Sequence, residues 1–168
     1  GDVLESIYRQ EAGPDAKMAR MGIVNAELVK IAVNTFVTGK ISFANTLSQI
    51  CSKLPGGDAH AVAGAVGMDK RVGGRFLKPG AAFGGPCFPR DNRAFAWLAS
   101  SLGVEAPGAR ATDAVNKSQI DFLVRTIVDA APSAKTVGLL GLSYKPKTNL
   151  MEESQAVDIA KRLLGRGI

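Results

Sequence analysis

The sequence has little of what several common protein classes require. It contains only two cysteines, Cys51 and Cys87, and a single histidine, His60. Two cysteines are too few for a disulfide framework and favour a reducing compartment. One histidine excludes a histidine-rich metal site and any mechanism that needs two imidazoles within one chain. The longest stretch without a charged residue, Ile41–Ser52, is shorter than the roughly 18 apolar residues of a membrane span, and no signal region opens the chain.

The overall composition is that of an ordinary globular protein. Of the 168 residues, 46% are hydrophobic and 21% are charged, which argues against general disorder. The length suits one domain, or one domain with a fragment of another. A formal net charge of +6 predicts an anionic partner without identifying it.

Helical patterns cover most of the first 130 residues. We expect helices over residues 1–10, 15–54, 58–66, 91–102 and 109–130. A turn is expected at Glu11–Pro14, and Asp15 and Asp58 are expected to cap the helices that follow them. Residues 23–37 are apolar on nearly all sides. We therefore expect this part of the long helix to be buried or to pair with another helix, such as the same helix of a second copy.

The pattern changes near the end of the chain. Thr136–Leu142 is a short apolar run typical of a buried parallel strand, and a polar loop and a helical pattern over residues 155–164 follow it. A strand, a loop and a helix form the first half of a βαβ unit. One such unit cannot build a sheet, so we interpret this end as the truncated start of a second domain. The beginning of the chain, within a helical pattern, also looks truncated.

The loop Phe83–Asp91 is the most informative stretch for chemistry. Cys87 follows Gly84, Gly85 and Pro86 and precedes a predicted helix, whose N-terminal backbone N–H groups would favour a thiolate. A thiolate in such a loop is a candidate nucleophile. The alternative is a small buried apolar residue, which is our interpretation of Cys51.

Two charged residues, Asp91 of this loop and Lys30 of the long helix, also have more than one interpretation. Asp91 is either the N-cap of the following helix or a carboxylate that orients a water or an amine near Cys87. Lys30 and Asn34 share one helix face because they are four residues apart. Lys30 is buried at a free-energy cost, pairs with Glu27 at the surface, or faces a ligand cavity. In a cavity its ammonium could transfer a proton or stabilise an oxyanion.

Cations gather between residues 70 and 93, opposed only by Asp69 and Asp91. They are Lys70, Arg71, Arg75, Lys78, Arg90 and Arg93. Such a group suits a phosphate-bearing ligand, or is a solvated basic surface. A basic helical module that binds nucleic acid or mediates assembly is an alternative function, although no recognised module pattern is present. A cysteine hydrolase or acyltransferase is another, but His60 is a poor candidate for its base.

Several blocks of the sequence occur together, in order, in one known family. They are Ala26–Asn34, Gly67–Arg71, Phe76–Gly80, Phe83–Asp91 and Gly141–Pro146. With them the chain resembles the UDP-glucose/GDP-mannose dehydrogenase family from about residue 20 to its end. The cysteine loop, with Lys30 and Asn34 at the expected distance before it, is the most specific part of the resemblance.

That family oxidises the C6 alcohol of a nucleotide sugar twice, with two NAD⁺, and the resemblance implies roles for matching residues. Cys87 matches the nucleophile that captures the aldehyde as a thiohemiacetal and then carries a thioester, which water hydrolyses. Lys30 matches the cation that stabilises the oxyanion, Asn34 its hydrogen-bonding partner at the sugar, and Asp91 the carboxylate that positions water. The matching substrate-binding positions are Phe76, Lys78, Phe83, Gly84 and Lys145, together with Arg71, which in this family reaches the substrate of the neighbouring subunit.

The resemblance also implies the architecture and the setting. It implies a mainly α fold, with a long central helix and a helical dimerisation domain over residues 1–131, similar to the C-terminal domain of 6-phosphogluconate dehydrogenase. Residues 132–168 would begin a truncated Rossmann-like nucleotide-binding domain. We expect NAD to be bound mainly by an N-terminal domain outside this sequence, the isolated chain to be inactive, and the long helix to form a homodimer. The enzyme would be cytoplasmic and act on UDP-glucose, with GDP-mannose or another UDP-sugar as the alternative, and without nucleic acid, membrane or metal.

Three positions depart from the family pattern. Most members have glycine at the position of Ala82 and serine at that of Pro86, and these changes are expected to reshape the turn around Cys87. Glu152 occupies the place of an arginine that contacts the cofactor. That role is therefore not transferred, and no residue of this sequence is assigned to the cofactor.

Overall fold

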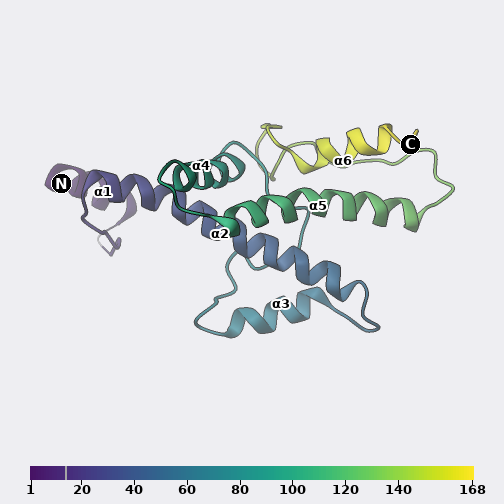
Figure 1. Cartoon of the computed structure of the whole chain (residues 1–168), viewed down its shortest axis with the longest axis horizontal. Helices are drawn as coiled ribbons and strands as arrows, with labels where there is room; N and C mark the ends of the chain where they lie inside the picture. The colour runs from purple at the N-terminus through teal and green to yellow at the C-terminus, as the bar shows by residue number, and fades with distance from the viewer. Residues whose placement is uncertain (14) are drawn as a thin grey trace. The chain divides into compact units, whose positions relative to one another are not determined.

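The computed structural model describes residues 1–13 and 15–168, and within these ranges the regular secondary structure is helical (Figure 1). The helices are α1 (Asp2–Ala12), α2 (Ile23–Cys51), α3 (Ala59–Met68), α4 (Phe88–Ser101), α5 (Pro107–Ala130) and α6 (Gln155–Leu164). The chain forms two compact units, residues 1–30 and residues 31–168, and α2 begins in the first and continues in the second. None of the described helices combines the length and the apolar character that crossing a membrane requires.

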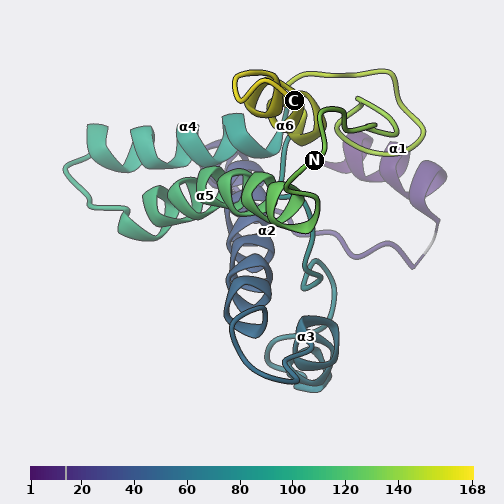
Figure 2. The same cartoon turned by 90° about the vertical axis from the view of Figure 1, so that its right-hand side faces the viewer.

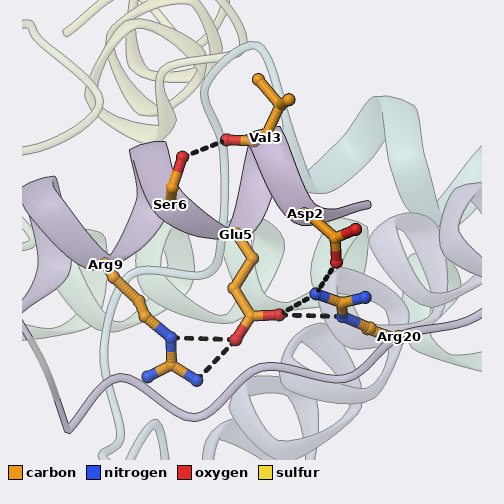
Figure 3. Close-up of polar contacts among 6 residues, drawn as sticks. All are labelled: Asp2, Val3, Glu5, Ser6, Arg9 and Arg20. Carbon is orange, nitrogen blue, oxygen red and sulfur yellow. Dashed lines mark hydrogen bonds and ion pairs between the residues drawn. The ribbon is translucent and has the colours of Figure 1, made fainter.

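In the first unit, charged side chains join α1 to the segment that follows it. The Glu5 carboxylate accepts hydrogen bonds from Arg9, at 2.6 Å, and from Arg20, at 2.5 and 2.8 Å, and Arg20 also pairs with Asp2 at 2.6 Å (Figure 3). The Arg20 and Arg9 guanidinium groups hold the pKa of Glu5 below its ordinary value of 4.5. Because the folded-state pKa is lowered, this stabilisation is complete above pH 4.5 and is lost as the pH falls through the folded-state pKa.

The predicted helices are all present, but α2 begins later than the sequence pattern indicated. Residues 15–22 are not helical, so the prediction that Asp15 caps the long helix is wrong. Gly22 immediately precedes α2 and its carbonyl accepts the first backbone bond, from Ala26 at 3.1 Å. Glycine is a poor helix former, which explains why the helix does not extend further back. The turn predicted at Glu11–Pro14 includes Pro14, which lies outside the described residues.

Two further helix starts follow from local chemistry. Asp58 caps α3 as predicted, because its carboxylate accepts hydrogen bonds from the backbone N–H groups of His60, at 2.8 Å, and Ala61, at 3.1 Å. α4 begins at Phe88, with Cys87 at its N-cap, so of the two interpretations of Asp91 that of the N-cap is wrong. Pro89 explains the earlier start, since its fixed φ angle and missing N–H suit the first turn of a helix.

The core of the second unit lies between α5 and α6. Ile120 and Val124 of α5 and Ile159 and Leu163 of α6 form a buried apolar cluster. In each helix the two residues are four positions apart, so they lie on one face. α4 also packs against α5, and Figure 2 shows α2 running across this pair.

The strand predicted at Thr136–Leu142 does not form. Val137 and Leu139 pack against the α5–α6 cluster whereas Leu140 is fully exposed, so the run keeps the alternation of a strand. A strand, however, is defined by backbone hydrogen bonds to a neighbouring strand, and no described residue takes part in such a ladder. In place of the expected βα unit, the structure has an irregular segment followed by α6.

α2 meets the rest of the second unit through a stripe of polar side chains on one helix face. They are Thr38, Ser42, Asn45 and Gln49. The Ser42 hydroxyl donates to the Thr112 carbonyl at 3.2 Å, and the Gln49 amide donates to the side-chain oxygen of Gln119 at 2.8 Å. α2 is therefore positioned by hydrogen bonds, which require a defined register along the helix.

Four large apolar side chains of α2 in the second unit are exposed. Val33, Phe36, Phe43 and Ile50 have exposed fractions of 55%, 72%, 51% and 50%. Val33 and Phe36 are therefore not buried within this chain, and the alternative expectation, that this part of the helix pairs with another helix, stays a prediction. Phe36, Phe43 and Ile50 recur every seven residues, which is the spacing of a helix that packs along another helix.

Candidate active site

Cys87 is an exposed free thiol at the N-cap of α4. Its backbone carbonyl accepts the N–H of Asp91 at 2.8 Å, the first hydrogen bond of the helix. The positive end of the helix dipole lies at this point, so negative charge on a reacting group near the sulfur is stabilised. Cys51 is only 6% exposed and lies at the end of α2, as the sequence predicted.

Asp91 is a buried carboxylate that connects α2 to the start of α4. It is 3% exposed, and its Oδ2 accepts a hydrogen bond from Asn34 Nδ2 at 2.6 Å. Its Oδ1 accepts from Arg90 Nε at 3.0 Å and Nη2 at 2.9 Å, and the adjacent carboxylate raises the pKa of Arg90. The structure thus brings Asn34 and Asp91 together one helical turn from Cys87.

Lys30 belongs to the first unit, whereas Asn34, Asp91 and Cys87 belong to the second. Lys30 precedes Asn34 by one turn within α2. Its role beside the cysteine stays a prediction.

Two of the predicted substrate-binding residues are arranged around Phe88, which follows Cys87. The rings of Phe76 and Phe83 each meet the Phe88 ring edge to face, with centroid distances of 6.4 and 6.5 Å. Phe83 is buried, while Phe76 is 43% exposed and carries the Arg75 guanidinium over its ring at 5.5 Å. The aromatic group therefore offers one exposed ring beside a cation, close in the sequence to Lys78.

Amide side chains of α5 fix the backbone of the cysteine loop. Asn116 accepts the N–H of Phe83 at 2.8 Å and donates to its carbonyl at 2.9 Å. Gln119 donates to the carbonyl of Gly80 at 2.9 Å, and the N–H of Gly80 donates to Asn45 at 2.8 Å. Sequence reasoning did not identify these residues. The signal that could have identified Asn116 and Gln119 is that both amides share a face of α5 with the apolar core positions.

Gly84 and Gly85 pack against the segment before α6, which contains Lys145. A Cβ atom at Gly84 would overlap the carbonyl oxygen of Glu153, and one at Gly85 would overlap the ring of Tyr144. The Lys145 ammonium lies 5.4 Å from the centroid of that same ring. Glycine is therefore required at both positions for the loop to approach this segment.

The other two predicted substrate residues, Arg71 and Lys78, are exposed. The Arg71 side chain is 88% exposed and pairs with Asp69 at 2.6 Å, which raises the pKa of Arg71. The described contacts do not tie either side chain to the Cys87 loop. A role for Arg71 toward a neighbouring subunit stays a prediction.

Ala82 is held in a conformation that favours glycine, with a φ angle of +91°. Replacing Ala82 with glycine is expected to stabilise the chain by about 0.5–1 kcal/mol, because the steric strain of the Cβ atom is removed. Urea denaturation of the two proteins measures this difference. Ala81→Gly is the matched control, since Ala81 has no positive φ and its replacement is expected to destabilise the chain. A loss of stability in Ala82→Gly would show that the φ angle is not strained.

The described residues do not fit a dinucleotide site. They contain no strand, glycine loop and helix of the kind that cradles a pyrophosphate. The exposed carboxylate of Glu152 would also repel a phosphate. No group of three or more His, Cys, Asp or Glu side chains in the described part of the chain is placed to hold a metal ion.

Comparison with known proteins gives a consistent result. The UDP-glucose/GDP-mannose dehydrogenase family, central domain, matches residues 24–118. The chain is 38% identical over 164 residues to the UDP-glucose 6-dehydrogenase YwqF of Bacillus subtilis (strain 168), covering 96% of this chain and 36% of that protein. It is also 38% identical over 169 residues to the GDP-mannose 6-dehydrogenase of Pseudomonas savastanoi pv. phaseolicola, covering 99% of this chain and 37% of that protein.

A solved structure supports the same relation. The UDP-glucose dehydrogenase from the hyperthermophilic archaeon Pyrobaculum islandicum matches with a TM-score of 0.89 at 38% identity, covering 99% of this chain and 38% of that chain. The chain thus spans a little over a third of the length of the relatives that it matches.

Proposed function

The chain belongs to the UDP-glucose/GDP-mannose dehydrogenase family, and we propose that it is the central part of an NAD-dependent nucleotide-sugar 6-dehydrogenase. The proposed reaction converts UDP-glucose to UDP-glucuronate in two successive oxidations at C6. The observation that carries the proposal is the exposed thiol of Cys87 at the N-terminus of α4, one turn from the buried Asp91 carboxylate, which is hydrogen-bonded to Asn34.

In the proposed mechanism Cys87 acts on the intermediate aldehyde. Its sulfur bonds to C6, and the carbonyl oxygen becomes the hydroxyl of a thiohemiacetal. Lys30 stabilises the developing oxyanion, and Asn34 hydrogen-bonds at the sugar. The second oxidation leaves a thioester on Cys87, and water hydrolyses it to the carboxylate, which frees the thiol.

Asp91 is proposed to position that water. Its carboxylate is buried and is held by Asn34 and Arg90, so its oxygens have fixed directions. A carboxylate fixed in this way can accept a proton from a water molecule that approaches the thioester.

The cofactor supplies two-electron oxidation when it is bound. Since the described residues do not fit a dinucleotide site, we propose that NAD is held mainly by parts of the protein outside this sequence. The isolated chain is accordingly expected to be inactive. Residues 1–131 would form the helical dimerisation domain of this cytoplasmic enzyme, and residues 132–168 would begin its C-terminal nucleotide-binding domain.

The proposed substrate is UDP-glucose, with GDP-mannose or another UDP-sugar as the alternative. Cys87-Phe88-Pro89 resembles UDP-glucose enzymes, whereas Ala82-Phe83-Gly84-Gly85 resembles GDP-mannose enzymes. Substrate contacts would come from Phe76, Lys78, Phe83, Gly84 and Lys145, together with Arg71 toward a neighbouring subunit.

A homodimer is the proposed assembly. The exposed residues Phe36, Phe43 and Ile50, spaced by seven along α2, form an apolar stripe that a second copy of the same helix would cover. Burial of these three side chains between two copies would stabilise the dimer by the hydrophobic effect.

The test is a turnover assay of the full-length encoded protein with NAD⁺ and each of UDP-glucose, GDP-mannose and a second UDP-sugar. We expect two NADH for each uronate formed and a preference for UDP-glucose. A preference for GDP-mannose would replace the substrate and keep the reaction class. The absence of NADH with every nucleotide sugar would refute the proposed function.

A further inference from the structure

The cysteine loop is attached to a second segment on both sides of Cys87. Before the cysteine, the N–H of Gly85 donates to the carbonyl of Glu152 at 3.0 Å. After it, Arg93 of α4 pairs with the Glu153 carboxylate, at 2.7 Å through Nη2 and 3.4 Å through Nη1. Adjacent residues of one segment, Leu142–Ser154, therefore hold both ends of the stretch that carries the thiol.

Close packing reinforces this attachment. Gly84 lies against the Glu153 carbonyl and Gly85 against the Tyr144 ring, so closely that no side chain fits at either position. The segment itself is closed by two bonds: the Ser154 hydroxyl donates to the Leu142 carbonyl at 2.7 Å, and the N–H of Tyr144 donates to the Leu150 carbonyl at 3.0 Å. The surface that meets the cysteine loop is therefore preformed.

Glu153 adopts a backbone conformation that a residue with a side chain rarely takes. Its φ angle is +48°, in the left-handed region. Such strain persists only where surrounding contacts overcome it. One of the contacts here is the ion pair with Arg93, whose pKa is raised by the Glu153 carboxylate, and the backbone bond from Gly85 to Glu152 is another. The ion pair holds the residue whose carbonyl fills the space above Gly84.

We propose that the Arg93–Glu153 ion pair is a latch that holds the Cys87 loop against the Leu142–Ser154 segment, and that both are positioning residues for the thiol. The latch is a property of this chain, and only its effect on turnover rests on the proposed function. Because Lys145 lies in the same segment, a ligand bound there would favour the latched loop, and the latched loop would favour the ligand.

Amide hydrogen exchange of this chain tests the latch directly. In Arg93→Ala the N–H of Gly85 is expected to exchange about two- to fivefold faster, the effect of losing an ion pair whose side chains are 53% and 44% exposed. The amides of Ile120 and Val124 should keep their rates, because the change is a local opening. Arg93→Lys should restore most of the protection. Arg110→Ala is the matched control, since it removes a similar exposed ion pair, with Glu105 at 3.1 Å, and should leave Gly85 unchanged.

A double-mutant cycle tests whether Glu153 is the residue through which Arg93 acts. If the pair acts as a unit, Arg93→Ala combined with Glu153→Ala should accelerate Gly85 exchange no more than either change alone. An unchanged Gly85 rate in Arg93→Ala, or fully additive effects, would overturn the latch. Equal acceleration of the α5 core amides would also overturn it, because that pattern indicates general destabilisation.

Turnover of the full-length enzyme tests the positioning role. Arg93→Ala is expected to lower kcat about tenfold with little change in KM, and Arg93→Lys to recover it. Unchanged kcat in an active enzyme would overturn the positioning role. A wild-type protein without turnover, but with the expected exchange pattern, would refute the proposed function and support the latch.

Discussion

Cys87→Ser is expected to lower uronate formation by the full-length enzyme about 10³-fold or more, because a hydroxyl is a far weaker nucleophile than a thiolate at neutral pH. The fold should be unaffected. Cys87 is exposed at the N-cap of α4, and serine is a favourable N-cap residue, so the free energy of unfolding should change by less than about 0.5 kcal/mol. Steady-state turnover and urea denaturation measure the two effects.

The second cysteine provides the control for this prediction. Cys51 is 6% exposed, so Cys51→Ser buries a hydroxyl and is expected to cost about 1–3 kcal/mol of stability. Its turnover at low temperature should stay near that of the unmodified enzyme. Nearly normal turnover in Cys87→Ser would show that Cys87 is not the nucleophile. A loss of turnover in Cys51→Ser alone would instead assign the nucleophile to Cys51.

Asp91→Asn is expected to affect both stability and chemistry. The substitution removes a buried negative charge that accepts hydrogen bonds from Asn34 and Arg90, and the expected cost is about 1–3 kcal/mol. Most of that cost should come from the Asn34 bond, because Arg90 is largely exposed and screened by water. In the proposed mechanism the hydrolysis of the thioester should slow about 10²-fold or more.

Mass spectrometry of the full-length enzyme after mixing with NAD⁺ and UDP-glucose checks the chemical part. A covalent adduct on Cys87 should accumulate in Asp91→Asn and not in the unmodified enzyme. Asp113→Asn is the matched control: Asp113 accepts a hydrogen bond from buried Asn92 at 2.9 Å, so its replacement should lower stability without the adduct. Slower turnover of Asp91→Asn without an adduct would contradict the water-positioning role.

Local sequence patterns were sufficient where neighbouring residues decide the structure. Asp58 and the apolar residues after it predict α3 and its cap, and residues 155–164 predict α6 with its observed bounds. The same kind of reasoning failed at residues 15–22, because the absence of proline does not by itself make a helix. It also placed the start of α4 at Asp91, whereas Pro89 allows the helix to begin three residues earlier, at Phe88.

The candidate site shows the same division. The composition of the Phe83–Asp91 loop marked Cys87 as a nucleophile candidate, and its exposure at a helix N-terminus agrees with that interpretation. The loop conformation depends on residues far away in the sequence. Asn116 fixes Phe83, and Glu153 fills the space that Gly84 leaves, and neither relation has a periodic signal.

By itself, the sequence determined the helical class of this chain, its family and the residue types at the cysteine loop, because these depend on local propensity and on motif spacing. Only the tertiary structure decided that Asp91 bonds Asn34 rather than capping α4, that Arg93 meets Glu153, and that Thr136–Leu142 is not a strand. The physical reason is that hydrogen bonds and strand ladders need partners from distant parts of the chain, and local pattern does not specify which partners come near.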